Sequence, residues 1–329
     1  MSARGGSASG GKKFGPYLIF IAAMLWATDS PFRAHLTQEL SSNFIVLGEH
    51  FVDVLFCLPI LAMGFSEIKK LNYKEWLAVL FIAVGGSALA SVAFTQAFHY
   101  VNPSVAILLQ KLQPLLAIGL AAAILKENIN SKFWLWAILA LVGAYLISFA
   151  GLKPELFPGE KLNPNLVGVG LALVAAFFWG ASTVLGKYVL NKTNFKVMTS
   201  LRFCVAFVFL FILNFAQSTF PKFSQVTGTD WLFIAIIAIT SGVVSLFIYY
   251  RGLQDTKASI ATLAELGFPM AAVLVNWISY KMGWISINTT LAPAQILGMA
   301  ILLFAVFRLS GYNQQQENLQ APTLSLNQN

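Results

Sequence analysis

Two ionisable residues lie deep inside long apolar segments of this sequence. Lys111 falls in the apolar run 103–125 and Glu265 in the run 258–280, each about eight residues from the start of its run. At 1.5 Å per helical residue, both lie about 12 Å deep, close to the middle of a bilayer. A charge there costs roughly 3 kcal/mol on insertion scales, so it is kept where it is paired, hydrated or functional. The two residues predict either an ion pair that fixes the packing or a pocket that holds a charged or zwitterionic metabolite.

A proline follows each of these charges within about one helical turn. Pro114 comes three residues after Lys111, and Pro269 comes four residues after Glu265. Proline removes a helix hydrogen bond and frees carbonyls of the preceding turn, which favours a helix break beside a binding site. A simple kink would leave the same pattern. The predicted substrate-binding set adds two polar neighbours and a duplicated tryptophan that would either stack on substrate or anchor the interface: Gln110, Lys111, Thr262, Glu265, Trp26 and Trp179.

A second group of ionisable residues lies in two other apolar segments, nearer their outer ends. Asp29 is in the first segment, and Glu49, His50 and Asp53 lie within five residues of one another in the second. Carboxylates beside a histidine, whose charge changes near neutral pH, favour a proton or cation relay. For Glu49 and Asp53 the alternative is hydration near the surface, with pairing to Arg33.

Other polar residues in the apolar segments are expected to be structural. Arg202 is interpreted as snorkelling to the cytoplasmic face, and Tyr249 and Tyr250 as members of an interfacial aromatic belt. Cys57 and Cys204 are interpreted as small core residues. The sequence contains no His-Glu-x-x-His, Gly-x-Ser-x-Gly or Walker motif, so we expect no catalytic residue, metal, cofactor or ATP-driven pumping.

The elements that position these residues are expected to be membrane helices. Hydrophobic residues make up 57% of the 329 residues and charged residues 10%, with a mean hydropathy of +0.72. A soluble domain carries about 25% charged residues, so much of this apolar surface must face lipid. The sequence predicts an all-α integral membrane protein with ten transmembrane helices, near 17–36, 43–64, 76–99, 103–125, 132–151, 166–188, 195–215, 231–250, 258–280 and 289–309.

The ten segments are expected to form two copies of a five-helix unit. The sequence frames around Pro114 and Pro269 match, and Trp26 and Trp179 open matching segments. An odd number of spans per copy inserts the second copy from the opposite side, which gives an inverted repeat with a site where the copies meet. The predicted order is a disordered cytoplasmic tail at 1–16, a first repeat at 17–151, an outer linker at 152–165, a second repeat at 166–309 and a disordered cytoplasmic tail at 310–329.

The distribution of charge predicts the orientation. Net charge is +8, and with the N-terminus inside, most of the 21 Lys and Arg residues fall on the cytoplasmic side. We therefore expect a multi-pass protein of the plasma membrane with both termini in the cytoplasm. The expected partners are a small-molecule substrate, the lipid bilayer and, under proton coupling, protons. Nucleic acid is not expected, and monomer and homodimer both remain open.

Several short motifs lie at characteristic places in one or both copies. They are Leu25-Trp26-Ala27 and Phe178-Trp179-Gly180 in the first helix of each copy, Leu201-Arg202-Phe203, and the stretch from Ala97 through Pro114 to Lys126-Glu127. With these motifs the chain resembles the EamA-type transporters of the drug/metabolite transporter superfamily, over about residues 17–309. It departs from that pattern at Glu49-His50-Phe51, where Arg-Phe would be usual, and at Lys281-Met282-Gly283, where a closing glutamate would be expected.

The resemblance implies a secondary transporter and not an enzyme. Such a protein would move an amino acid, an amine or a drug-like compound, usually outward, by alternating access around the midplane site. Coupling to protons is one option that the acidic residues favour. A passive channel or facilitator is the alternative, and an intramembrane enzyme is a weaker one because the motifs named above are absent.

Overall fold

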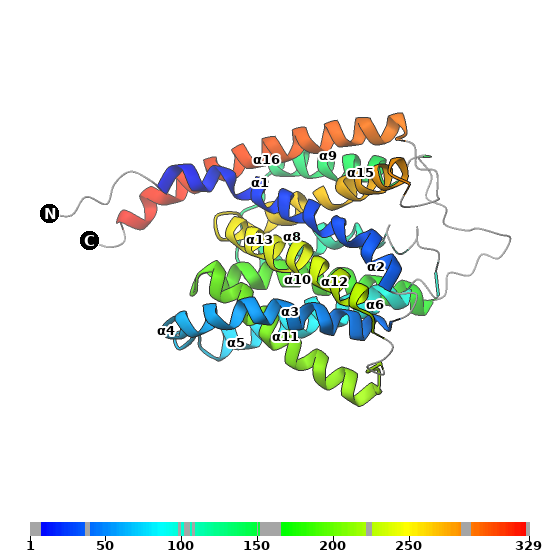
Figure 1. The fold of residues 1–329 in the computed structure, drawn as a ribbon. Helices are drawn as coiled ribbons and strands as arrows, with labels where there is room; N and C mark the ends of the chain where they lie inside the picture. Colours follow the sequence, from blue (N-terminus) through cyan, green and yellow to red (C-terminus); the bar gives the residue numbers. More distant parts are fainter. Residues whose placement is uncertain are drawn as a thin grey trace.

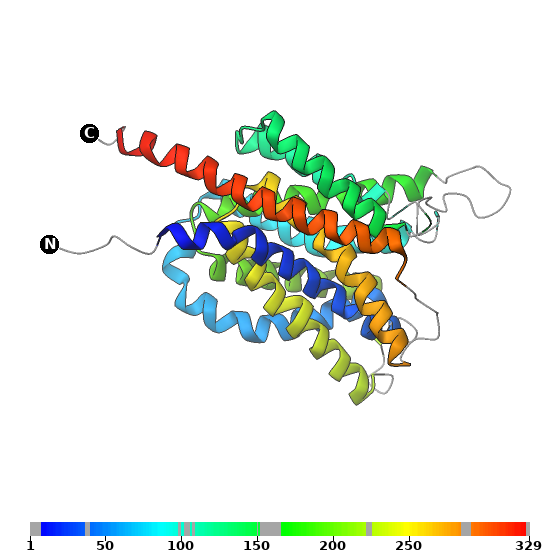
Figure 2. The same cartoon turned by 90° about the horizontal axis from the view of Figure 1, so that it is seen from above.

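The structure, a computed structural model, describes residues 8–36, 40–97, 100–101, 106, 109–149, 151, 166–221, 226–283 and 291–326. Every regular element in this part of the chain is a helix, and the long helices run side by side along one bundle (Figures 1 and 2). Eight of the described helical segments are long and apolar enough to cross a membrane. The all-helical part of the prediction is therefore confirmed.

The first half of the chain contains short and interrupted helices. The expected first span is divided into α1, η1 and α2, and only residues 106 and 109–125 of the expected fourth span are described, with α8 beginning just before Pro114. The elements are α1 (Ala8–Trp26), η1 (Ala27–Asp29), α2 (Ser30–Leu36), α3 (Ser42–Met63), α4 (Phe65–Ile68), α5 (Tyr73–Leu80), η2 (Phe81–Leu89), α6 (Ala90–Ala97), α8 (Gln113–Ile124) and α9 (Ser131–Ser148).

The second half has longer helices and a second break. The chain leaves the helix at Glu265 and Leu266, between α14 and α15 and four residues before Pro269. The elements are α10 (Leu166–Leu190), α11 (Phe195–Gln217), α12 (Gly228–Ile237), η4 (Ala238–Val244), α13 (Ser245–Gln254), α14 (Ala258–Ala264), α15 (Gly267–Lys281) and α16 (Pro293–Leu326).

Two of the long helical segments widen into π-helical turns near their middles, at η2 and η4. Both turns contain small residues, Gly85 and Gly86 in η2 and Ser241 and Gly242 in η4. A side chain on Gly85 would collide with Phe178 of α10, and one on Gly242 would collide with Asp53 of α3. These glycines let neighbouring helices approach closely, and π-helical turns are frequent at functional sites.

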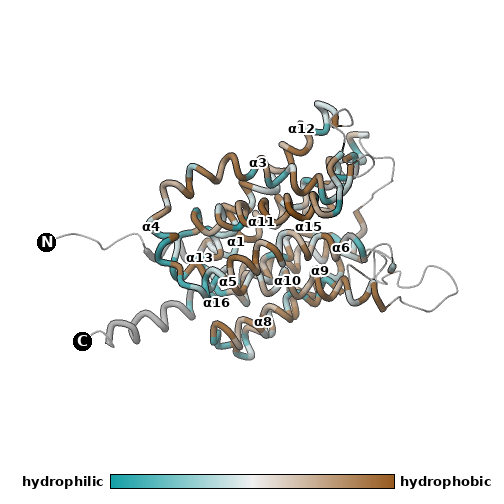
Figure 3. Tube along the Cα trace, turned by 90° about the horizontal axis from the view of Figure 1, so that it is seen from below, coloured by the Kyte–Doolittle hydropathy of each residue, from teal (hydrophilic) through white to brown (hydrophobic). Residues whose placement is uncertain are grey.

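The core and the helix ends hold the bundle in register. The most extensive contacts join α9 with α16, α3 with α11, and α1 with α13. Beyond α8, the Glu127 carboxylate accepts the backbone N–H groups of Ala258 (2.7 Å) and Ser259 (3.1 Å), so it ties the end of α8 to the start of α14. In Figure 3, hydrophobic residues run along the helices, while hydrophilic residues gather toward their ends.

The structure differs from the expected tails. α1 begins at Ala8, inside the predicted tail 1–16, and α16 continues through the predicted tail 310–329 as far as Leu326. One cause is packing, because Tyr312 lies against Phe133 and Asn313 bonds to the backbone of Asp255 and Lys257. The start of α1 and the end of α16 lie at the same end of the bundle, near α4 (Figure 1). The predicted linker 152–165 lies outside the described residues.

Candidate functional site

Glu265 lies at the break between α14 and α15, and both of its carboxylate oxygens accept hydrogen bonds. Oε1 accepts from the hydroxyls of Thr183 and Tyr249, each at 2.8 Å. Oε2 accepts from Nε2 of Gln113 at 2.9 Å. Gln113 is held in turn by Gln110, whose Nε2 donates to Gln113 Oε1 at 3.1 Å. The donors come from α8, α10 and α13, so one carboxylate joins helices that are far apart in sequence.

Lys111 lies in the turn that precedes α8 and forms no ion pair with Glu265 in the described part of the chain. The ion-pair interpretation therefore does not describe this structure, because neutral donors occupy the Glu265 carboxylate. The role of Lys111 in holding substrate stays a prediction. Thr262, about one turn before Glu265, is buried, and its hydroxyl has no hydrogen-bond partner among the described residues.

The two tryptophans approach this centre differently. The ring of Trp26 lies 5.4 Å from that of Tyr249, which donates to Glu265. Trp179 packs against Phe94 at 5.3 Å and precedes Thr183 by one turn of α10. Of the two tryptophans, Trp26 is therefore the one whose ring contacts a hydrogen-bond donor of Glu265.

Arg202 and the tyrosine pair differ from their expected roles. Arg202 does not snorkel to a surface: its Nε donates to Ser87 of η2 at 2.8 Å and its Nη1 donates to Tyr250 at 3.1 Å. Tyr249 and Tyr250 are buried, with rings 5.2 Å apart, so they are not belt residues. Inside the bundle, hydrogen bonds to neighbouring helices are available to all three side chains, which removes the need to reach water.

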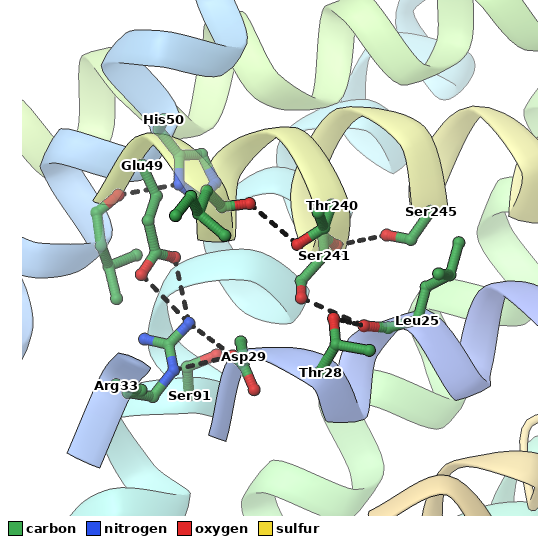
Figure 4. Close-up of polar contacts among 12 residues, drawn as sticks. Leu25, Thr28, Asp29, Arg33, Glu49, His50, Ser91, Thr240, Ser241 and Ser245 are labelled. Carbon is green, nitrogen blue, oxygen red and sulfur yellow. Dashed lines mark hydrogen bonds and ion pairs between the residues drawn. The ribbon is translucent and has the colours of Figure 1, made fainter. Parts of the chain in front are cut away.

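The second polar group is built around a cation (Figure 4). Arg33 donates through Nε to Asp29 at 2.8 Å, and its Nη2 lies 3.0 Å from Glu49 Oε1. The geometry matches the alternative in which Glu49 pairs with Arg33. It also offsets part of the negative charge of this group, since one guanidinium faces two carboxylates.

His50 and Asp53, one turn apart on α3, each have a buried polar atom without a partner among the described residues: His50 Nε2 and Asp53 Oδ1. His50 Nδ1 lies 2.9 Å from the carbonyl oxygen of Val46, so the proton belongs on Nδ1 in the neutral ring. The His50 ring lies edge-on to Phe203 at 5.6 Å. A Cβ added to Gly242 would be 2.5 Å from Asp53 Oδ1. These atoms are therefore available to a small ligand such as a proton.

Two stretches of the chain, residues 13–149 and 166–311, match the model of the EamA-like transporter family. The chain belongs to the EamA-like transporter family. The resemblance drawn from the tryptophan and Arg-Phe motifs is thereby confirmed, and so is the prediction of a multi-pass membrane transporter.

Similar proteins carry transporter names. The riboflavin transporter ImpX of Fusobacterium nucleatum is 31% identical over 310 residues, covering 91% of this chain and 98% of ImpX. An uncharacterised transporter of Bacillus subtilis, YetK, is 24% identical, covering 82% of this chain and 81% of YetK. A solved structure described only as a crystal structure of a protein superimposes with a TM-score of 0.68 over 92% of this chain and 98% of its own, at 17% identity, which shows a shared fold.

In this EamA-like transporter, the predicted site contains none of the three residues that donate hydrogen bonds to Glu265. Gln113 precedes Pro114, and Thr183 follows Trp179 by one helical turn, so nearby residues in the sequence could have indicated both positions. No nearby residue indicated Tyr249, because its partner is 16 residues away across a helix break. The described residues include no group of His, Cys, Asp or Glu that could hold a metal ion.

Proposed function

We propose that this EamA-like transporter is a secondary carrier that moves a small metabolite by alternating access around Glu265. The observation that carries the proposal is the partly buried carboxylate at a helix break, which accepts bonds from both family-matched segments. Gln113 belongs to the first segment, and Thr183 and Tyr249 belong to the second. A ligand that replaces one of these donors changes how the two segments are held together, which is what a carrier requires.

For the topology we propose ten membrane helices as two inverted five-helix repeats, at 17–151 and 166–309, joined by an outer linker at 152–165. The double match to the family model supports the duplication. The shared end of α1 and α16 supports placing both termini on one side, which charge assigns to the cytoplasm of a plasma-membrane protein. Protease-cleavable tags at both termini should be cut only from the cytoplasmic side, and cleavage of the two tags from opposite sides would refute this topology.

The named relative makes riboflavin the first substrate to test, ahead of amino acids, amines and drug-like compounds. The rings of Trp26 and Tyr249 beside a hydrogen-bonding carboxylate suit a planar heteroaromatic compound. Pairing of Arg33 with two carboxylates weakens the case for a cationic substrate. We propose export as the direction and protons as the coupling ion. His50 and Asp53 would carry the proton, because each has a buried atom that finds no partner among the described residues.

The substrate is identified by screening the purified protein for ligands that raise its melting temperature, at two pH values, because a bound ligand stabilises the folded state. The screen contains riboflavin, amino acids, amines and drug-like compounds. A passive facilitator would also bind such a ligand, so transport itself is measured next.

The substitution Glu265→Gln should abolish transport in proteoliposomes while the protein still reaches the membrane and keeps its fold. The matched control is Asp255→Asn, which removes a carboxylate from a partly exposed ion pair with Arg251 and should leave transport intact. Normal flux through the Glu265→Gln variant would refute the assignment of Glu265 as the centre of the site.

A further inference from the structure

Arg202 and Glu265 lie at the same depth in the bundle. α11 begins at Phe195 and α14 at Ala258, and each charge comes seven residues after its helix start. Both helices start at the end where α10 finishes, because Lys187 of α10 bonds to the carbonyls of Leu253 and Gln254 while α11 follows α10 after a short turn. At 1.5 Å per residue, both side chains stand about 10 Å along their helices.

The Arg202 guanidinium is fixed in place with donors left over. Ser87 and Tyr250 receive Nε–H and one Nη1–H, and Nη2 has no hydrogen-bond partner among the described residues. A guanidinium offers five N–H donors in one rigid plane. Two bonds to different helices orient this plane, so the remaining donors present a preorganised edge to a ligand.

Glu265 offers a complementary acceptor. Oε1 already accepts two bonds, but Oε2 accepts only the one from Gln113 among the described residues. An ionised carboxylate has about four acceptor positions, so Oε2 retains capacity for one more donor. Arg202 and Glu265 also interact electrostatically, and they are linked through the contacting rings of Tyr249 and Tyr250. The charges of this pair already balance, so a neutral ligand suits it better than an ion.

We propose that Arg202 and Glu265 together bind the imide edge of a neutral, planar heteroaromatic substrate. A carbonyl oxygen of the imide accepts from the free guanidinium edge of Arg202, and the imide N–H donates to Glu265 Oε2. Tyr249, whose hydroxyl donates to Glu265, and the Trp26 ring packed against it supply aromatic surface on the Glu265 side of the site. The inference rests on the proposed function and names the substrate class of that same site. It assigns Arg202 a direct role in binding the substrate.

The test compares riboflavin, which carries an imide, with its N3-methyl analogue, which keeps the ring system and side chain but lacks the imide N–H. Binding to purified full-length protein is measured by quenching of flavin fluorescence. Wild type should bind riboflavin about 10 to 100-fold more tightly than the analogue, since a hydrogen bond to a charged group is lost. Equal affinities for the two compounds would overturn the proposal without any variant being made.

Arg202 is tested separately. Arg202→Gln should weaken riboflavin binding about 10 to 100-fold, Arg202→Lys should recover part of the loss, and Arg251→Gln, which changes a partly exposed arginine, should have no effect. A purely structural role would lower the melting temperature of the Arg202 variants with unchanged riboflavin affinity, and that result would contradict the proposal. Wild-type transport of an amine or amino acid with no riboflavin binding would overturn this inference but leave the carrier function standing. Absence of any transported compound would overturn both.

Discussion

Glu265 shows how a carboxylate is kept inside the bundle without a direct ionic partner. Three neutral donors surround it at 2.8–2.9 Å, and the hydroxyl oxygens of Thr183 and Tyr249 also lie 2.9 Å apart, so their two O–H groups alternate among three short contacts. In a site of low polarity, the hydrogen bonds of such a network are strong when every polar group has a partner. Removing one member leaves a polar group unpaired, which costs free energy. The same network is therefore suited to respond to a ligand that competes for one donor.

A different carboxylate, Glu67 of α4, makes the stability depend on pH. Its oxygens accept the backbone N–H of Asn194 at 2.9 Å, the Asn194 side-chain amide at 2.6 Å and the Thr193 hydroxyl at 3.1 Å. The backbone N–H of Asn194 is the main cause that holds the pKa of Glu67 below its ordinary value. A lowered folded-state pKa adds stability above the unfolded pKa and loses it as pH falls through the folded pKa.

We therefore expect Glu67→Gln to lower the melting temperature at neutral pH, with a difference from wild type that shrinks as pH falls below about 4. The measurement is thermal unfolding of both proteins in detergent across a pH series. A difference that stays constant from neutral to acid pH would show that the charge of Glu67 contributes nothing.

At the scale of single residues, the sequence was enough to identify the charged residues inside apolar segments but not the residues that bond to them. Lys111 and Glu265 stand out because apolar residues surround them, and so does Asp53. Thr183 and Tyr249 are ordinary residues in apolar helices, and only the fold shows that they meet Glu265. The same lack of three-dimensional information led to the snorkelling interpretation of Arg202.

Among the elements, α9 and α16 approach each other closely at a facing pair of glycines. A Cβ on Gly143 would lie 2.9 Å from the carbonyl oxygen of Gly298, and a Cβ on Gly298 would lie 2.7 Å from that of Gly143. Backbone atoms cannot move aside as side-chain ends can, so the two helices would have to separate. Small residues at such crossings are what lets membrane helices pack closely.

Gly143→Ala and Gly298→Ala should each destabilise the protein, by about 1–3 kcal/mol for an overpacked contact. Gly119→Ala in α8 is the matched control, because an added Cβ there meets no atom within 4 Å. Alanine also favours the helix over glycine by about 0.5–1 kcal/mol, so the control should be neutral or stabilising. Thermal unfolding in detergent compares the three variants, and a Gly143→Ala protein as stable as the control would show that α9 and α16 are not tightly packed.

At the scale of elements, hydrophobic runs predicted where most helices lie, and prolines predicted where two of them break. Close packing is evident at Gly85 and Gly242, where an added Cβ would collide with a neighbouring helix. The π-helical form of η2 and η4 could not be predicted, because it depends on the neighbouring helices. Nor could the extension of α16, which depends on contacts of Tyr312 and Asn313 with segments distant in sequence.

Across the whole molecule, the two family-matched segments share one polar centre but contribute unequally. The second segment supplies Glu265, Arg202 and two of the three donors to the carboxylate, while the first supplies Gln113 and Ser87. In the proposed duplication, His50 stands in the first segment where Arg202 stands in the second. Its Nε2, which has no hydrogen-bond partner in the described part of the chain, gives the first segment a titratable group in place of a fixed charge. This division fits a carrier in which the second family-matched segment binds the substrate and the first carries the proton.

Counterflow tests the carrier claim most directly. Proteoliposomes containing the purified protein are loaded with unlabelled substrate, riboflavin first, and diluted into a trace of labelled substrate without any ion gradient. The account predicts a saturable, transient accumulation of label above its equilibrium level, absent from the Glu265→Gln variant. Simple equilibration of the label through wild-type protein, with no overshoot and no saturation, would identify a passive pore and contradict alternating access around Glu265.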